Sequence, residues 1–391
     1  MVDGLREEFA RTIDRPLTDV RLVRAPYRFC PMGAHLDHQD GPVTGVAFDR
    51  ALSLAFVPTD DGRVRLRSTS ESTDVSFSLD SVPERPAGNW GDYARGAARA
   101  LAGRIHVGIE GLVEGEMASG GVSTSAALGV ACLLALQSAN YLELTERETV
   151  DLDQSIENDY LGLRNGILDP SIILLAKRNE LVHLDCRSRD VSWVPWGGAG
   201  DPPAFVAVHS GIASALVDTG YNARVEECTR AAATLLTRDG RSVPETPRLR
   251  DVSVDAFAAH RNALPDAERK RATHYFTEVD RVGRGTDAWR RGDARALGEI
   301  VTETGESSIR NYECGAPELI DLFQRLVAQP EVLGARFSGA GFRGYAVALV
   351  AAEDAADVAA SVVADYRSAH PNLADAVHAH VCRSADGARM T

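Results

Sequence analysis

The chain has 391 residues, 44% of them hydrophobic and 25% charged, as in an ordinary globular protein. Its formal net charge of −14 argues against nucleic acid and against an anionic membrane surface as partners. The length suits two closely packed lobes. We place their boundary in the Gly- and Pro-rich stretch 194–203, which predicts an N-terminal lobe over 1–195 and a C-terminal lobe over 196–391.

Targeting and redox signals point to the cytoplasm. The N-terminal stretch lacks the apolar core of a secretory signal, and no apolar run reaches the ~18 residues that a membrane span needs. Six cysteines are scattered along the chain without a C-x-x-C pair, which favours reduced thiols over disulfides or a zinc site. We therefore expect a cytoplasmic protein, either a monomer or a weak homodimer.

The first unusual stretch is "RAPYRFCPMGAHLDHQDG", residues 24–41. It brings Arg28, His35, Asp37 and His38 together among small residues. Taken alone, the histidines could be ordinary hydrogen-bonded loop residues, and Asp37 could cap a helix.

Strands and helices alternate irregularly after this stretch. Alternating and β-branched residues predict strands over 51–58, 63–70, 74–80, 180–186 and 204–210. Helical periodicity is clear from Val225 to Leu235 and from Val358 to Tyr366. This mixture predicts an α/β fold, with α+β layers.

A candidate anion site lies in "ASGGVSTSAALGVACLLAL", residues 118–136. Glycines allow backbone N–H groups to approach an anion closely, and the start of a helix adds free donors. The hydroxyl groups of Ser123, Thr124 and Ser125 add further donors, and one of them could bind Mg²⁺. The alternative is a Ser- and Gly-rich cap on a buried helix. The chain contains no G-x-x-x-x-G-K-[ST] phosphate loop.

Two acidic residues lie on either side of the predicted end of a helix. The sequence "TERE" predicts a capping box between Thr145 and Glu148, opening a helix that runs to about Tyr160. Glu157 lies near the end of this helix, and Asp169 lies twelve residues further on. Asp169 precedes a proline and could simply cap the next helix. Phosphoryl transfer to a hydroxyl, however, needs one carboxylate near the hydroxyl proton and another near the metal.

The glycine-rich "GAGFRG", residues 339–344, matches the pattern G-x-G-x-x-G of dinucleotide-binding sites, but its sequence context differs from that of such a site. It is followed directly by "YAVALV", which reads as a strand and not as the helix that such a site requires. We therefore predict a turn between strands here.

Three of these segments, in this order, resemble the motifs of the GHMP kinase family. "APYRFCPMGAHLDH" is similar to the galactokinase pattern A-P-G-R-x-N-L-I-G-E-H-x-D-Y, "SGGVSTSAA" to G-G-G-L-S-S-S-A, and "FSGAGFRGYAVALV" to T-G-G-G-F-G-G-C-x-V-A-L. Within the family, "ENDYLGLRNGILD", "GYNARVEEC" and "NYECGAPELI" resemble the plant-type galacturonokinases. The resemblance implies a two-lobed GHMP kinase fold with its active site between the lobes. It also implies ATP-dependent phosphorylation of D-galacturonic acid at the anomeric C1 hydroxyl.

The resemblance also implies residue roles. Asp169 takes the position of the catalytic aspartate, and Arg28 that of the arginine beside it. Ser125 and Glu157 match the Mg²⁺ ligands. The ATP phosphates correspond to Ser119, Gly120, Gly121, Val122, Ser123, Thr124 and Ser125. The sugar contacts correspond to His35, Asp37, Gly166 and Tyr221, and Gly339, Ala340 and Gly341 match a glycine loop packed against the site.

Ala34 stands where galactokinases have a glutamate within reach of the sugar's C6 group. A carboxylate there would repel the C6 carboxylate of galacturonate by roughly several kcal/mol in a partly desolvated pocket. Ala34 removes this repulsion, which predicts a uronate as the substrate and penalises galactose. Candidate partners for the substrate carboxylate are Tyr27, Arg164, Arg224 and Arg343. The rival interpretations are a kinase for galactose, glucuronate or arabinose, or a non-catalytic sensor of sugar and ATP.

Overall fold

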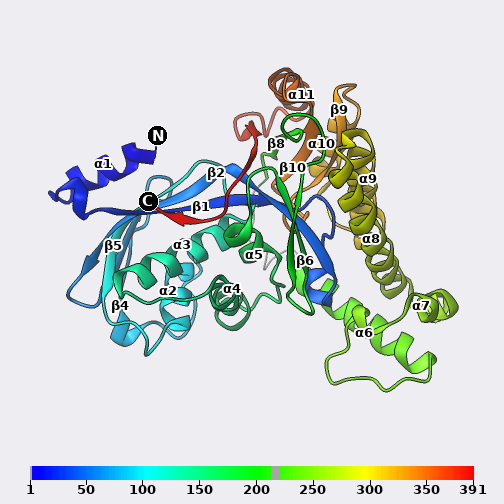
Figure 1. The fold of residues 1–391 in the computed structure, drawn as a ribbon, viewed down its shortest axis with the longest axis horizontal. Coiled ribbons are helices and arrows are strands. Elements are labelled where there is room, and N and C mark those ends of the chain that lie inside the picture. Colours follow the sequence, from blue (N-terminus) through cyan, green and yellow to red (C-terminus); the bar gives the residue numbers. More distant parts are fainter. Residues whose placement is uncertain (1, 213–219) are drawn as a thin grey trace.

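The computed structural model describes residues 2–212 and 220–391, and it confirms the α/β class (Figure 1). The described strands form two sheets. The strands of the first sheet are β1 (Arg21–Phe29), β2 (Pro42–Thr59), β3 (Arg63–Ser68), β4 (Val75–Ser78), β5 (Gly108–Gly115), β6 (Glu180–Asp185), β7 (Val191–Pro195), β12 (Ser384–Ala385) and β13 (Arg389–Met390). The strands of the second sheet are β8 (Ala204–Ser210), β9 (Val332–Phe337), β10 (Tyr345–Val350) and β11 (Val377–Cys382).

The long strand β2 organises the first sheet. Six strands follow the order β13-β1-β2-β5-β3-β4, and β12 and β6 also pair with β2, while β7 pairs with β6. The β3–β5 pair is parallel. The second sheet is antiparallel, in the order β11-β8-β10-β9. All five predicted strands are present; the one expected over 51–58 is the second half of β2, and "YAVALV" forms β10, as expected.

Helices pack around the two sheets and extend beyond them at one end of the molecule (Figure 1). They are α1 (Val2–Thr12), α2 (Asp92–Ala100), α3 (Thr124–Ala139), α4 (Glu146–Ser155), α5 (Leu168–Leu175), α6 (Tyr221–Arg238), α7 (Val254–His260), α8 (Asp266–Arg291), α9 (Ala294–Ser307), α10 (Pro317–Val327) and α11 (Ala355–Ala369). Helices α2 to α5 lie on one side of the long strands, and α8 and α9 run side by side at the other end of the molecule. Among the described residues, no helix has both the length and the apolar character needed to cross a membrane.

The predicted capping box is present at the start of α4. The backbone N–H of Glu148 donates to the Thr145 hydroxyl at 3.2 Å, and the Glu148 carboxylate accepts from the backbone N–H of Thr145 at 2.9 Å. The helix ends at Ser155 and continues as a π-helical turn, Ile156–Tyr160, that carries Glu157. Such turns often occur at functional sites because the extra residue redirects the side chains.

The two sheets share a continuous apolar core. Phe29 of β1 and Phe48 of β2 both pack on Phe205 of β8, with ring centroids 5.7 Å and 5.4 Å apart. The C-terminal strands β12 and β13 return to the first sheet, where they pair with β2 and β1. The stretch 194–203 joins β7 to β8, and a division of the chain at 195/196 stays a prediction.

Candidate active site

A cleft of about 830 Å³ lies where the glycine-rich loops of the sequence meet. The Gly- and Ser-rich loop before α3 and the glycine loop between β9 and β10 form part of its wall. Apolar side chains, including Trp90, Met117 and Leu128, line another part. A cleft with backbone donors at one end and apolar walls at the other suits a nucleotide with its phosphates and its base.

Asp169 lies at the border of this cleft, in the first turn of α5 and not at its cap position. One carboxylate oxygen accepts a hydrogen bond from Nε of Arg28 at 2.6 Å, and the other accepts from the hydroxyl of Ser123. Arg28 comes from β1 and is 3% exposed. Burial works against the charge of Arg28, but the Asp169 carboxylate holds the pKa of this guanidinium above its usual value. The buried Nη1 of Arg28 has no hydrogen-bond partner among the described residues.

The loop before α3 presents backbone donors to the cleft. Gly120 and Gly121 adopt φ values of 100° and 93°, which favour glycine, and Ser123 follows with a φ of 58°. Ser119, Thr124 and Ser125 line the cleft with these glycines. The Val122 side chain instead lies in the core, and its carbonyl accepts from the backbone N–H of Arg28 at 3.3 Å.

The glycine loop 339–344 supports this phosphate loop directly. A Cβ added to Gly339 would lie 2.9 Å from the Cα of Gly121, and one added to Gly344 would lie 2.5 Å from the carbonyl oxygen of Gly120. Tyr345 accepts a hydrogen bond from the backbone N–H of Ala118 at 3.1 Å. The third motif therefore holds the second in place by close backbone packing, and Gly341 and Ala340 also line the cleft.

Asp37 and Gly166 lie in contact beside the cleft. Asp37 begins a short 3₁₀ turn, and a Cβ on Gly166 would come within 2.4 Å of its carboxylate. Both residues line a second cavity of about 550 Å³ with Arg164. Burial, followed by the charge of Asp169, raises the pKa of Asp37 to about 6. The structure thus brings together two of the predicted sugar contacts close to the predicted catalytic aspartate.

His35 belongs to an aromatic cluster on the same side. Its ring stacks on Tyr312, with centroids 3.8 Å apart and an interplanar angle of 6°. Tyr312 also hydrogen bonds with Nε2 of His38 at 2.9 Å. Tyr221, the first residue of α6, packs against both histidines at 6.4 Å and 5.9 Å between centroids. His35, Asp37, Gly166 and Tyr221 are therefore gathered in one region, as the resemblance implies.

The four residues considered as partners for the C6 carboxylate of the substrate lie in different parts of the site. Tyr27 and Arg343 line the larger cleft with the phosphate loop. Arg164 pairs with Glu226 at 3.0 Å on the rim of the smaller cavity. Arg224 pairs with Glu227 at 3.2 Å and donates to the carbonyl of Tyr312 at 3.1 Å. Ala34 itself is buried.

Ser125 and Glu157 form an oxygen-rich pair at the start of α3. The Glu157 carboxylate accepts from the amide of Asn165, and its charged form is also favoured by the Ser125 hydroxyl. Burial, followed by the charge of Asp169, raises the pKa of Glu157 to about 7. Asp153 lies nearby with a buried oxygen that has no partner among the described residues. Burial, followed by the charge of Glu157, raises the pKa of Asp153 well above its usual value, so Ser125 and Glu157 are the oxygen ligands here of the kind that Mg²⁺ takes.

Activity toward the sugar should depend on the ionisation of Asp37. A carboxylate accepts a hydrogen bond from a sugar hydroxyl more strongly than a carboxylic acid does. The raised pKa means that Asp37 becomes ionised only as the pH rises through about 6. We expect kcat/KM for the sugar to rise between pH 5 and 7 with a break near 6, and Asp37→Asn to remove this break. Identical profiles for both proteins would contradict the role.

Ser123 and Tyr312 make contacts in the site that the sequence did not predict. Ser123 was expected among the ATP-binding residues, but its hydroxyl binds Asp169. Tyr312, which stacks on His35, lies in "NYECGAPELI" and ends a π-helical turn, Ser308–Tyr312. The only sequence signal for Tyr312 was the resemblance of this stretch to a family motif.

Two family profiles match the chain. The profile described as the GHMP kinases N terminal domain covers residues 92–177, and the one described as GHMP kinases C terminal covers residues 286–369. The first contains the phosphate loop and Asp169, and the second contains β9 and much of the helical region around it.

Full-length relatives agree with these profiles. A galacturonokinase from Arabidopsis thaliana is 40% identical over 415 aligned positions, covering 100% of this chain and 98% of the relative. A galactokinase from Roseiflexus sp. (strain RS-1) is 33% identical, covering 94% and 92%. The crystal structure of Lactococcus lactis galactokinase complexed with galactose superposes with a TM-score of 0.88 at 27% identity, covering 99% of each chain.

Proposed function

The chain belongs to the GHMP kinase family, and we propose that it transfers the γ-phosphoryl group of ATP to the anomeric C1 hydroxyl of D-galacturonic acid. The products are galacturonate 1-phosphate and ADP. The observation that carries the proposal is the Asp169 carboxylate, which Arg28 and Ser123 hold between the phosphate loop and the predicted sugar contacts. The 40% identity to a galacturonokinase over the full chain supports the choice of sugar.

The proposed chemistry uses the geometry of Asp169 directly. Its carboxylate orients the C1 hydroxyl and takes its proton as the hydroxyl oxygen bonds to the γ-phosphorus. The bond from this phosphorus to the bridging oxygen then breaks, and that oxygen leaves with ADP. Arg28, whose buried Nη1 has no partner in the described part of the chain, supplies positive charge to the phosphoryl oxygens as they move. The backbone N–H groups of the phosphate loop hold the remaining phosphates.

Mg²⁺ is the cation that the site would take. Ser125 and Glu157 would hold it, and it would neutralise charge on the phosphate oxygens. Within residues 2–212 and 220–391, no group of three or more His, Cys, Asp or Glu side chains is arranged to hold a metal. Two protein ligands are nevertheless enough for Mg²⁺, which commonly completes its shell with water and phosphate oxygens.

The small side chain of Ala34 supports a uronate over galactose. The buried guanidinium groups of Arg281 and Arg336 lie beside the loop that carries Ala34, where Arg281 pairs with Glu278 and Arg336 donates to the carbonyl of Cys30. An anionic sugar is compatible with such surroundings. Galactose, glucuronate and arabinose are the competing sugars, and a sensor without transfer activity is the competing class. Asp169, Arg28, Glu157 and Ser125 favour a working kinase over a sensor.

The test of the proposed reaction determines which carbon of the sugar carries the phosphate. The full chain is incubated with ATP, Mg²⁺ and galacturonate, and ADP release is followed by a coupled assay. Phosphorus NMR of the product should show a phosphate coupled to the anomeric proton. ADP release without sugar phosphate, or a phosphate at another carbon, would contradict the proposal. The cytoplasmic location and the monomeric or weakly dimeric state remain predictions from the sequence.

A further inference from the structure

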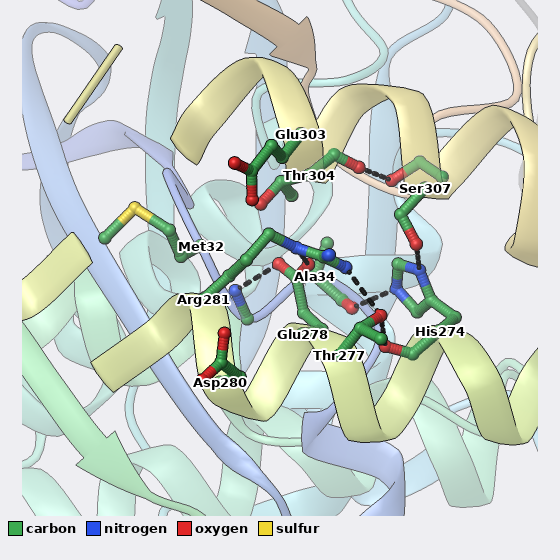
Figure 2. Close-up of polar contacts among 12 residues, drawn as sticks. Met32, Ala34, His274, Thr277, Glu278, Asp280, Arg281, Glu303, Thr304 and Ser307 are labelled. Carbon is green, nitrogen blue, oxygen red and sulfur yellow. Dashed lines mark hydrogen bonds and ion pairs between the residues drawn. The ribbon is translucent and has the colours of Figure 1, made fainter. Parts of the chain in front are cut away.

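Helix α8 lies against the loop that carries the predicted sugar contacts, and its side chains bind the backbone of that loop (Figure 2). The Glu278 carboxylate accepts a hydrogen bond from the backbone N–H of Gly33 at 2.7 Å. Its other oxygen accepts from Nε of Arg281 at 2.7 Å. Glu278 is 0% exposed. A buried carboxylate that is bound through both oxygens has little freedom to move, so it fixes the position of the Gly33 N–H.

His274, one turn earlier on α8, binds the next residue of the loop. Its Nε2 lies 3.0 Å from the carbonyl oxygen of Ala34, and its Nδ1 lies 3.0 Å from the hydroxyl of Ser307 on α9. A carbonyl can only accept, so Nε2 must carry the hydrogen and Nδ1 must accept from the serine. Burial lowers the pKa of His274, which keeps the ring neutral and in this tautomer.

These two contacts bracket a strained part of the loop. The Ala34 carbonyl belongs to the peptide bond that precedes His35, so His274 fixes the plane of that peptide. His35 has a φ of 63°, a left-handed conformation that is uncommon for a residue with a side chain. Such a conformation persists only when its surroundings hold it. The direction of the His35 ring, and of Asp37 two residues later, therefore depends on α8.

The charged state of Glu278 indicates that this residue does more than fill space in the core. A buried ion pair costs desolvation and often stabilises a protein no better than apolar residues would. Burial alone would raise the pKa of Glu278, yet the Arg281 guanidinium beside it brings this pKa below its usual value. The acceptor for Gly33 is thus a full carboxylate, which makes a stronger hydrogen bond than a neutral group. On β9, the buried Arg336 makes a similar contact by donating to the carbonyl of Cys30 at 2.7 Å.

We propose that Glu278 and His274 are positioning residues that set the affinity for the sugar without touching it. They act by holding the backbone from Gly33 to His35 in the conformation that presents His35 and Asp37. The inference rests on the proposed function only in taking this loop as the sugar site. The phosphate loop has a separate support in the glycine loop 339–344, so the affinity for ATP should not depend on α8.

The test separates the two substrates. His274→Phe keeps a ring of similar shape but removes the donor to Ala34. We expect it to raise the KM for galacturonate about tenfold, as for one lost hydrogen bond. The KM for ATP should stay within about twofold, because the phosphate loop is untouched. His274→Gln restores an N–H donor and should recover part of the sugar affinity.

A second variant tests Glu278 without leaving the charge of its ion-pair partner Arg281 unpaired. Glu278→Gln combined with Arg281→Met keeps an acceptor for Gly33 and removes both charges. The neutral acceptor is weaker, so the sugar KM should rise several-fold with the ATP KM unchanged. Asp280→Asn is the matched control on the same helix. Asp280 is 67% exposed in its side chain and pairs with Arg284, so both KM values should equal those of the wild type.

The outcomes are decisive in either direction. A rise in sugar KM alone, with partial rescue by glutamine, supports the positioning role. The inference is overturned if both KM values rise together, or if both stay unchanged, whether kcat falls or not. If His274→Phe does not fold, the Glu278 double variant decides. If the wild-type protein does not phosphorylate galacturonate, it is the proposed function that is wrong. The variants are then compared on the sugar that the wild type does phosphorylate.

Discussion

Replacing Asp169 with asparagine is expected to lower kcat about a thousandfold or more, within the range found for a lost general base. Asparagine has nearly the same shape but cannot take the proton of the C1 hydroxyl. Its amide oxygen can still accept from Nε of Arg28, and its amide nitrogen can donate to the Ser123 hydroxyl, so the side chain keeps its place. The measurement is kcat at saturating ATP and sugar, with the thermal midpoint recorded for each protein.

ATP binding separates lost chemistry from lost structure in this variant. The phosphate loop should keep its backbone conformation in this variant, because the glycine loop 339–344 packs against Gly120 and Gly121. A fluorescent ATP analogue should therefore bind Asp169→Asn with nearly wild-type affinity. A kcat within tenfold of the wild type would show that Asp169 is not the group that handles the proton.

Replacing Ala34 with glutamate is expected to reverse the preference for the sugar. In the arrangement that the family resemblance implies, the new carboxylate would lie beside that of the substrate, and the repulsion should lower kcat/KM for galacturonate at least a hundredfold. Galactose should improve in the same variant, since its C6 hydroxyl can donate to the new group. Because Ala34 is 3% exposed, the thermal midpoint of the variant is recorded together with its kinetics. Steady-state kinetics on both sugars measures the effect.

Ala34→Gln distinguishes charge from volume. Glutamine fills nearly the same space without a negative charge, so it should reduce kcat/KM for galacturonate much less than glutamate does. If both variants lose activity toward galacturonate equally, crowding and not charge explains the effect, and the electrostatic account of Ala34 is wrong.

Much of the fold and of the candidate site could be predicted because local chemistry determined it. The capping box at Thr145 and Glu148 is formed as expected, since both partners lie within one helical turn. The strand "YAVALV" was distinguishable from a helix by its unbroken run of apolar and β-branched residues. The approach of Asp169 to Arg28 was predicted only through the resemblance to a family, because nothing in the residues themselves specifies a contact between positions 141 apart.

The contacts by which α8 holds the loop of predicted sugar contacts could not be predicted from the sequence. His274 and Glu278 lie on an amphipathic helix more than 230 positions after the loop that they bind. On such a helix, charged and polar side chains are expected to face solvent. Their burial follows from the packing of α8 against β2 and α9, which local patterns do not encode. The π-helical turn under Glu157 was likewise expected as ordinary helix, because its residues have no local signature.

Direct competition between two sugars tests the central claim most directly. Equal concentrations of galacturonate and galactose are offered to the wild-type chain with limiting ATP and excess Mg²⁺, and the two sugar 1-phosphates are separated by anion exchange. A site with Ala34 in place of an acid should give galacturonate 1-phosphate in at least about hundredfold excess. Galactose 1-phosphate as the main product would contradict the claim that the missing acid selects a uronate.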